Sequence, residues 1–534
     1  MANTADLIVA EGAIFFGGKD PISGDVAVEA GRIVDVGPDL RKSKGGRTEV
    51  IDAGGGLITP GFIDAHVHPV TGGLKLLRCS LDRAHSGDEA LDQVASYAAE
   101  HPEMAWIWGG GWSLEWFPGG TPSVAALDLA TGNRPAFLYN KDGHGAWVNS
   151  AALERAQITA QTPDPPDGRI ERQPDGSPQG TLHEGAMSLI EAVLPPVAGA
   201  EWEEALAAGQ RYLLSCGITG WQDAAVEPEH EAAYLALAGR GELVASVVAA
   251  LWWDRGRGQD QIAELMGRRA LQAPGYRPTS VKLMLDGIVE NYTAALLEPY
   301  LDQSGSPTTS TGIDFIDEEE LIEIVSQLDR LGFQCHFHAL GSRAVRHALI
   351  ALARLSTGRD LRHHLAHLQV VDPSDLDLFS RTGATANLQA LWACKEPQMI
   401  ELTLPFISDD SAESQYPFGS LVAHGVPLAM GSDWPVSTAQ VFEQIEVAVT
   451  RRHPLHRDRE PLGANQALSL EQALTAFTAG SARVNRIEDQ VGNIAVGMVA
   501  DLAVMDRNPF AEPPIGETRV THTIKGGRTV YRQE

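Results

Sequence analysis

The sequence predicts an α/β fold in which a strand and a helix alternate eight times, with additional β-rich and α+β segments. Two observations predict it. Short apolar runs alternate with helical patterns over residues 59–84 and 196–495, and turn-rich β segments lie at both chain ends. Eight consecutive strand–helix units are typical of a (β/α)8 barrel, the TIM barrel. In such barrels the functional side chains lie at the carboxyl ends of the strands.

Each expected barrel strand is a short apolar run with turn residues at its ends. The first, GFIDAHVH, lies between Pro60 and Pro69. A helical pattern after Gly341 follows the fifth. The eight expected strands cover residues 61–68, 217–224, 243–253, 280–287, 333–340, 362–371, 384–390 and 426–435.

The two chain ends are expected to share one small β domain, made of residues 1–58 and 496–534. Residues 25–37 form two alternating runs around an Ala-Gly pair, which is a hairpin pattern. Residues 521–532 form a similar pair around Gly-Gly. Neither segment is large enough to fold alone, so we expect the two to associate.

Residues 85–195 are expected to form an inserted α+β subdomain over the barrel mouth, because they are too many for one strand–helix crossover. The segment has strand patterns of its own at 104–110 and 135–143. Four tryptophans near its start either pack its core or wall a substrate pocket. They are Trp106, Trp108, Trp112 and Trp116.

Composition limits the partners and the compartment. The formal net charge of −29 argues against nucleic acid and anionic membranes. The longest apolar run, 243–253, is too short to cross a bilayer. The four cysteines show no CxxC spacing and the start of the chain shows no basic signal segment, so we expect a cytoplasmic protein. The expected partner is a small-molecule substrate.

Histidines, a lysine and an aspartate at five expected strands predict a metal site. His66 and His68 are one residue apart, so they point to the same side of the first strand. Nitrogen and oxygen ligands without thiolates favour zinc, with manganese, iron or cobalt as alternatives. The further candidates on later strands are Lys282, His338, His367 and Asp433.

Strand alternation separates these candidates from other histidines. His336 shares a face with His338 but lies about 7 Å deeper, so we expect it in the core or behind the ligands. In the sixth strand, alternation places His367 on the ligand side and His364 on the side of the helices. We expect neither His364 nor His347 to be a ligand.

Lys282 lies within an apolar strand, where an ammonium group is costly unless it is neutralised, paired or functional. It shares a strand face with Met284 and Asp286. A carboxylated lysine would supply a carboxylate that can bridge two metals. The alternative is a buried lysine paired with Asp286 or Asp433.

These motifs, in combination and order, resemble the amidohydrolase superfamily and its YtcJ-like branch, amidohydrolase family 3; the chain is similar to N-substituted formamide deformylases. The resemblance implies a distorted TIM barrel, a composite β-sandwich from both chain ends and a subdomain inserted after the first barrel strand. The segments that carry it are 56–69, 142–153, 180–187, 217–224, 281–300, 337–349, 362–373, 428–437 and 492–506.

The resemblance also implies one or two metal ions, and a homodimer as one option for assembly. Two positions depart from the family pattern: Ala366 replaces a glutamate and Ser342 replaces an aspartate, which affects local hydrogen bonding and specificity. The implied ligand set is complete. It consists of His66 and His68 with Asp433 for a first metal, His338 and His367 for a second, and carboxylated Lys282 as the bridge.

The leading functional hypothesis is metal-dependent hydrolysis of a non-peptide C–N bond in an N-substituted amide or formamide. Metal-bound hydroxide would attack the carbonyl carbon, and Asp433 would pass the proton of the water to the leaving amine. The density of tryptophans favours an apolar or aromatic N-substituent. The candidates for substrate binding are Trp112, His144, Asp286, Gln389 and Trp434.

Two other classes of function remain open. A mononuclear deaminase of a cyclic amidine is the first, although its relatives place an acid where this chain has Leu340. A non-catalytic binding protein on a degenerate barrel is the second. Loss of ligands would mark that class, and all six are present.

Overall fold

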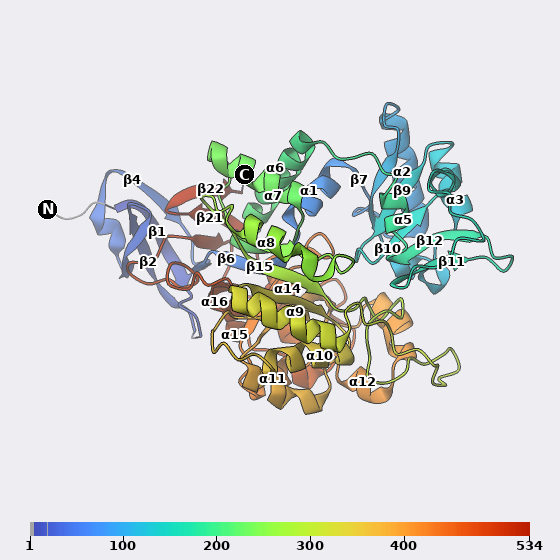
Figure 1. The fold of residues 1–534 in the computed structure, drawn as a ribbon. Coiled ribbons are helices and arrows are strands. Elements are labelled where there is room, and N and C mark those ends of the chain that lie inside the picture. Colours follow the sequence, from blue (N-terminus) through green and yellow to red (C-terminus); the bar gives the residue numbers. More distant parts are fainter. Residues whose placement is uncertain (1–4, 19, 534) are drawn as a thin grey trace.

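The computed structural model describes residues 5–18 and 20–533, and these residues form three sheets. In Figure 1 the sheet of the chain ends lies at the left, the barrel in the middle and the insertion at the right. The part of the chain that the structure describes has no helix long and apolar enough to span a membrane.

Strands from both chain ends pair within one sheet. Strand β5 (Leu57–Pro60) lies between β1 (Ala5–Ile14) and β20 (Leu502–Met505), parallel to the first and antiparallel to the second. The N- and C-terminal segments are therefore hydrogen-bonded to each other. The remaining strands are β2 (Ile22–Glu29), β3 (Arg32–Gly37), β4 (Lys44–Asp52), β21 (Val520–Lys525) and β22 (Arg528–Arg532).

The central sheet contains eight strands, and every neighbouring pair is parallel. All eight strands expected from the sequence are present, and they form a nearly closed, barrel-like parallel sheet. In spatial order they are β6 (Phe62–Val67), β13 (Ile218–Val226), β14 (Ser246–Trp252), β15 (Tyr276–Met284), β16 (Gln334–Ala339), β17 (His364–His367), β18 (Thr385–Leu388) and β19 (Leu428–Met430).

Backbone hydrogen bonds bring the first and last barrel strands together at their carboxyl ends. The N–H of Asp433 donates to the carbonyl of His66 over 2.8 Å, and the N–H of His68 donates to that of Trp434 over 2.9 Å. The loop after β19 is therefore fixed against the end of β6, which places Asp433 beside the two histidines.

Amphipathic helices cover the outside of the barrel. Helix α9 (Glu318–Leu331) shows why they form: the Asp317 side chain caps its N-terminus, and Gly332 ends it at a φ of 83°. Its buried face comprises Leu321, Ile324, Val325 and Leu328. Other helices around the barrel are α7 (Pro228–Arg240), α8 (Ile262–Arg269), α10 (Ser342–Ala353), α11 (Leu376–Thr382), α13 (Phe418–Ala423) and α14 (Val441–Thr450).

Two helices flank the insertion in the sequence and pack closely on each other. They are α1 (Pro69–Leu77), which follows β6, and α6 (Gly199–Ser215), which precedes β13. A Cβ atom on Gly73 would lie 1.8 Å from the carbonyl oxygen of Ala205 in α6. Glycine is therefore needed at this contact, which holds the entry and exit of the insertion together.

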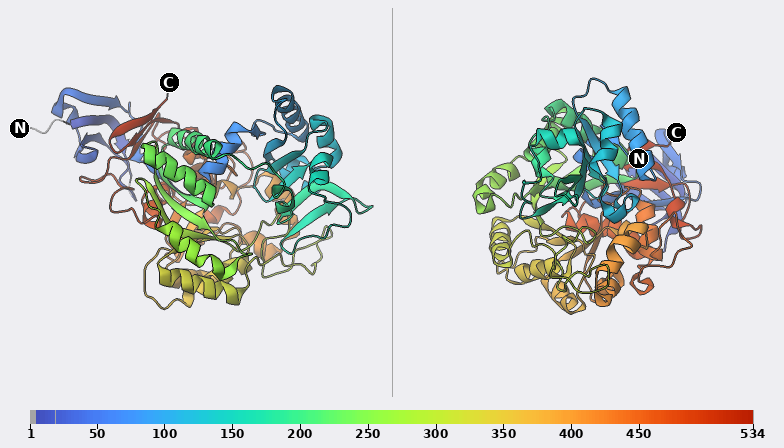
Figure 2. Two further views of the ribbon diagram at one scale, coloured as in Figure 1. Left: turned by 45° about the horizontal axis from the view of Figure 1, so that its top comes forward. Right: turned by 90° about the vertical axis from the view of Figure 1, so that its right-hand side faces the viewer.

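The insertion forms a six-stranded sheet whose first strand is β7 (Cys79–Ser80), so it begins earlier than the expected residue 85. In the right-hand view of Figure 2 the insertion lies in front of the barrel. Its other elements are β8 (Ile107–Trp112), β9 (Ala136–Asn140), β10 (Gly145–Val148), β11 (Gly168–Arg172), β12 (Pro178–Glu184), α2 (Gly87–Glu100), α3 (Val124–Thr131), α4 (Ser150–Arg155) and α5 (Ser188–Glu191).

Candidate metal centre and substrate pocket

Two histidines from β6 and an aspartate from the loop after β19 form a compact group. Nε2 of His66 lies 3.4 Å from Oδ1 of Asp433, and Nε2 of His68 lies 3.2 Å from the same oxygen. One ligand atom from each residue lies within 4.8 Å of the other two. This arrangement suits three ligands of a single divalent cation.

The ends of β16 and β17 add two further histidines. The rings of His338 and His367 lie 4.4 Å apart, and the His367 ring lies 4.8 Å from that of His66. Nδ1 of His367 lies 3.9 Å from Oδ2 of Asp433. His367 thus lies beside both His66 and Asp433, and His338 lies beside His367.

The donor atoms of this group fit a divalent metal. Among the described residues, both ring nitrogens of His367 and Oδ1 of Asp433 are buried without a hydrogen-bond partner. Burial lowers the pKa of His338 and of His367 well below the usual value, which keeps both imidazoles neutral. Neutral imidazole is the form that binds metal, and a bound cation would satisfy these atoms.

Neighbouring side chains orient the histidines. Nδ1 of His66 lies 2.8 Å from Nε2 of His336, which leaves Nε2 of His66 for the ligand group. Oδ1 of Asp286 lies 3.4 Å from Nδ1 of His338. Asp286 is fully buried and also accepts hydrogen bonds from the backbone N–H groups of Ala295, Leu340 and Gly341.

Lys282 lies beneath the ligand group. It is 2% exposed, and its Nζ lies 3.5 Å from Nε2 of His66. Among the described residues no carboxylate lies within ion-pair distance of it, so neither Asp286 nor Asp433 contacts it directly. Burial, partly opposed by the charge of Asp433, lowers the pKa of Lys282 to about 7.

Asp433 is ionised in this setting. Burial alone would raise the pKa of its carboxyl group, but the close approach of the His66 and His68 rings outweighs it. The pKa of Asp433 therefore lies well below its usual value. A carboxylate held in this way can accept a proton from a group bound beside it.

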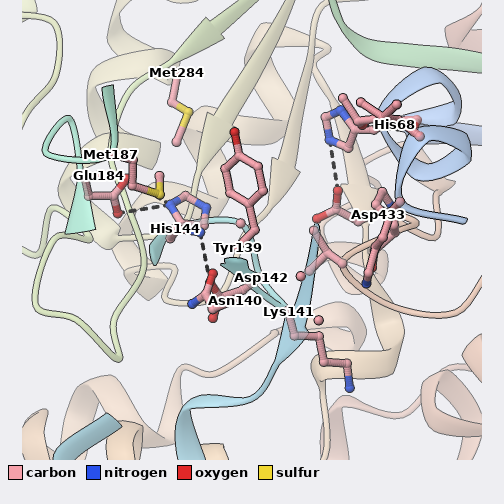
Figure 3. Close-up of a pocket in the computed structure, with 18 of the residues that line it drawn as sticks. His68, Tyr139, Asn140, Lys141, Asp142, His144, Glu184, Met187, Met284 and Asp433 are labelled. Carbon is pink, nitrogen blue, oxygen red and sulfur yellow. Dashed lines mark hydrogen bonds and ion pairs between the residues drawn. The ribbon is translucent and has the colours of Figure 1, made fainter. Parts of the chain in front are cut away.

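A cavity of about 480 Å³ lies over the ligand group, between the strand ends and the insertion (Figure 3). It is lined by His66, His68, Lys282, His338, His367 and Asp433 on the barrel side. Its apolar walls include Trp108, Met187, Trp202, Trp252 and Met284. Its polar walls include Tyr139, Asp142, His144 and Glu184, which come from the insertion.

Of the five expected substrate-binding residues, only His144 lines this cavity. Trp112 is fully buried in the core of the insertion, where its indole N–H donates to the carbonyl of Leu138 over 2.8 Å. Trp434 packs on the ring of Tyr212, with centroids 4.8 Å apart. Both tryptophans therefore pack the protein interior, which corrects their expected position on the pocket wall.

Gln389 and Asp286 also lie outside the cavity lining. Oε1 of Gln389 accepts the backbone N–H of His367 over 2.8 Å, so Gln389 holds the backbone of a candidate ligand. Asp286 lies behind His338, as described above. Each residue lies at the expected end of a barrel strand, but its polar side-chain atoms form hydrogen bonds within the protein.

His364 faces the interior of the barrel, which corrects the expected alternation. Its Nε2 lies 2.9 Å from Oε1 of Gln222, and its ring lies 4.0 Å from that of His336. His363 faces the helices instead, with Nε2 3.2 Å from Asp329 of α9. His367 reaches the ligand side because its φ of 79° breaks the regular strand geometry.

Sequence reasoning missed Glu184 and most of the cavity wall. Nδ1 of His144 lies 3.0 Å from Oε1 of Glu184, although 40 positions separate the two residues. The available signal was the acid at the end of the apolar run in GTLHEGAM. Pairing of β10 with β12 brings it to His144, and no local pattern predicts that pairing.

Comparisons with known proteins agree with this arrangement. A model of the amidohydrolase family matches residues 49–531. The putative amidohydrolase YtcJ of Bacillus subtilis is 28% identical, with 95% of this chain and 96% of that protein covered. The N-substituted formamide deformylase of Arthrobacter pascens is 26% identical, with 95% of each chain covered. The protein LONG AFTER FAR-RED 3 of Arabidopsis thaliana is 27% identical over 99% of this chain and 92% of its own.

Two solved structures share the fold over almost their whole length. Both are described as uncharacterized metal-dependent hydrolases. The one from Pyrococcus furiosus is 23% identical, with a TM-score of 0.71 and with 94% of this chain and 99% of that chain covered. The one from Pyrococcus horikoshii is 22% identical, with a TM-score of 0.73 and with 95% of this chain and 98% of that chain covered. The family model covers most of the chain, and the barrel carries the ligand group at its strand ends. The protein belongs to the amidohydrolase family and is a hydrolase that acts on carbon–nitrogen bonds.

Proposed function

We propose that this protein hydrolyses the C–N bond of an N-substituted amide or formamide, with divalent metal ions held at the barrel mouth. The observation that carries the proposal is the convergence of nitrogen and oxygen ligands on Asp433 at the floor of a cavity with apolar walls. The name of the deformylase relative supports the choice of substrate class.

The proposed site holds two ions, with zinc as the first choice because the ligands are imidazoles and carboxylates. When bound, such ions supply activation of water and polarisation of a carbonyl group. We propose that Lys282 is carboxylated and bridges the ions. Its burial, with no ion pair to a carboxylate among the described residues, supports this, because a neutral amine can add carbon dioxide, lose a proton and become a carbamate ligand.

Asp433 is proposed as the proton carrier. Its carboxylate is buried and ionised, and it lies within 3.4 Å of both histidines of β6. It would accept a proton from the attacking water and donate it to the nitrogen of the departing amine. A single carboxylate can perform both transfers because attack and departure take place at the same carbon.

The apolar wall is proposed to bind the N-substituent. Trp202 and Trp252 come from the barrel side of the cavity, and Trp108 and Met187 come from the insertion. Burying an aromatic group against such a wall contributes about 2–3 kcal/mol of binding free energy. The preferred substrate would therefore be a formamide or amide with an arylalkyl group on nitrogen.

A panel of compounds tests the proposal directly. Protein supplied with zinc or manganese would be incubated with formamides, acetamides, lactams and cyclic amidines, with release of amine, acid or ammonia as the readout. We expect amine and formate from arylalkyl formamides. Release of ammonia from a cyclic amidine alone would favour the deaminase. Failure of every compound with metal-replete protein would contradict the proposed function.

A further inference from the structure

One wall of the cavity carries a histidine–glutamate pair, and Figure 3 shows it across the cavity from Asp433. Nδ1 of His144 lies 3.0 Å from Oε1 and 3.1 Å from Oε2 of Glu184. The backbone N–H of Glu184 also donates to the carbonyl of His144 over 3.1 Å. Side chain and backbone therefore both hold the pair in one arrangement.

The barrel fixes Glu184 from the other side. The hydroxyl of Thr293 donates to Oε1 over 2.8 Å, and the side-chain amide of Asn291 donates to it over 3.3 Å. A Cβ on Gly287 would lie 2.3 Å from Oε1, so only glycine fits beside it. Glu184 itself has a φ of 51°, a strained conformation that a non-glycine residue keeps only when its surroundings impose it.

This arrangement decides which nitrogen of His144 is free. Because Nδ1 is held by Glu184, Nε2 is the ring nitrogen left for the cavity, and His144 lines that cavity. The His144 ring lies 5.3 Å from that of His338, one of the candidate metal ligands. A group bound at the ligands is thus within reach of Nε2.

We infer that Nε2 of His144, oriented by Glu184, donates a hydrogen bond to the carbonyl oxygen of the scissile amide or formamide. The inference rests on the proposed function and names a residue pair that selects the acyl group. No bond to His144 forms or breaks: the ring is an imidazolium that donates from Nδ1 to Glu184 and from Nε2 to the substrate, and it keeps both protons. The contact strengthens as negative charge develops on the oxygen, so it lowers the barrier as well as orienting the substrate.

The charge of the pair is consistent with a donor. Nδ1 of His144 forms an ion pair with the Glu184 carboxylate, which favours the doubly protonated ring with a donor at both nitrogens. The same donor would discriminate between substrate classes. A carbonyl oxygen accepts its hydrogen bond, whereas a protonated cyclic amidine presents only N–H donors and no acceptor nitrogen.

A purely structural role is the competing explanation, and the insertion contains a matched control. Nε2 of His183 lies 3.2 Å from Oε1 of Glu171, and His183 is 2% exposed. This second histidine–glutamate pair belongs to the same sheet but does not line the cavity. Loss of either pair should weaken the insertion, but only loss of the first should affect catalysis.

The experiment compares His144→Phe, His144→Gln, Glu184→Gln and His183→Phe in the full-length, metal-replete protein. The substrate is N-(2-phenylethyl)formamide, and its product 2-phenylethylamine serves as a competitive inhibitor that lacks the carbonyl oxygen. We expect His144→Phe to lower kcat/KM about 100-fold, mainly through kcat. The inhibition constant of the amine and the metal content should stay unchanged.

The other variants give the remaining outcomes. In His144→Gln the side-chain amide can donate a hydrogen bond, so kcat/KM should be about tenfold higher than in His144→Phe. Glu184→Gln keeps the shape of the pair and should lower kcat/KM about tenfold. Glu184→Gln thereby keeps the test informative if His144→Phe fails to fold. Equal kcat/KM in His144→Phe and His183→Phe would overturn the inference alone. A wild type that hydrolyses no amide or formamide would overturn the proposed function and the inference together.

Discussion

The barrel end and the insertion end of the cavity are built in different ways. On the barrel end the polar groups lie at the ends of several parallel strands, and neighbours such as His336 and Asp286 fix their orientation. On the insertion end His144 and Glu184 meet through antiparallel pairing of strands that are distant in sequence. Under the proposed function, the barrel would supply the reacting groups and the insertion would select the substrate.

Asp433→Asn should give the largest effect at the barrel end. The variant keeps the size of the side chain and removes the carboxylate that we assign to proton transfer, so kcat should fall about 1,000-fold or more. Circular dichroism and the melting temperature should show that the fold is kept. Near-wild-type turnover would remove Asp433 from the mechanism.

Metal removal should abolish activity without unfolding the protein. Dialysis against a chelator would leave the buried nitrogens of His367 without partners, so Tm should fall as well. Adding zinc or manganese should restore both activity and Tm. Full activity of protein shown by elemental analysis to be metal-free would contradict the role of the barrel end.

Lys282→Ala tests the bridge between the two proposed ions. We expect turnover to fall by at least about 100-fold, because a ligand shared by both ions is lost. A short carboxylic acid such as propionate can occupy the space that is left, so activity should partly return when it is added. Absence of rescue, together with unchanged metal content, would indicate that Lys282 acts only through its charge.

Trp252→Ala should give the smallest effect, at the apolar wall. Loss of aromatic contact should raise KM for an arylalkyl formamide about tenfold. The KM for N-methylformamide serves as the control, because its substituent is too small to reach the wall. Equal changes for the two compounds would mean that Trp252 does not contact the N-substituent.

Much of the barrel could be predicted because a parallel strand has a simple pattern. Each apolar run formed a strand, and residues at strand ends such as His66 and His338 lie together as expected. The prediction was wrong for His364 because it assumed regular alternation up to His367, where the backbone leaves the strand conformation. Strand alternation also could not show that the side chain of Gln389 accepts a hydrogen bond from the backbone of His367.

The cavity wall was harder to predict because it depends on tertiary contacts. Trp108 and Trp112 lie four residues apart in the same strand, β8. Trp112 nevertheless packs in the core of the insertion, whereas Trp108 lines the cavity. Residue type does not distinguish these positions. Nor does it show that the insertion begins at Cys79, since β7 has only two residues.

The amount of metal per chain tests the central claim most directly. Protein purified without chelator would be analysed for all first-row transition metals, with Lys282→Ala measured in parallel. We predict about two equivalents for the wild type, mainly zinc, and a clear decrease for the variant. A wild type that binds no metal, even after zinc and manganese have been supplied, would contradict the account.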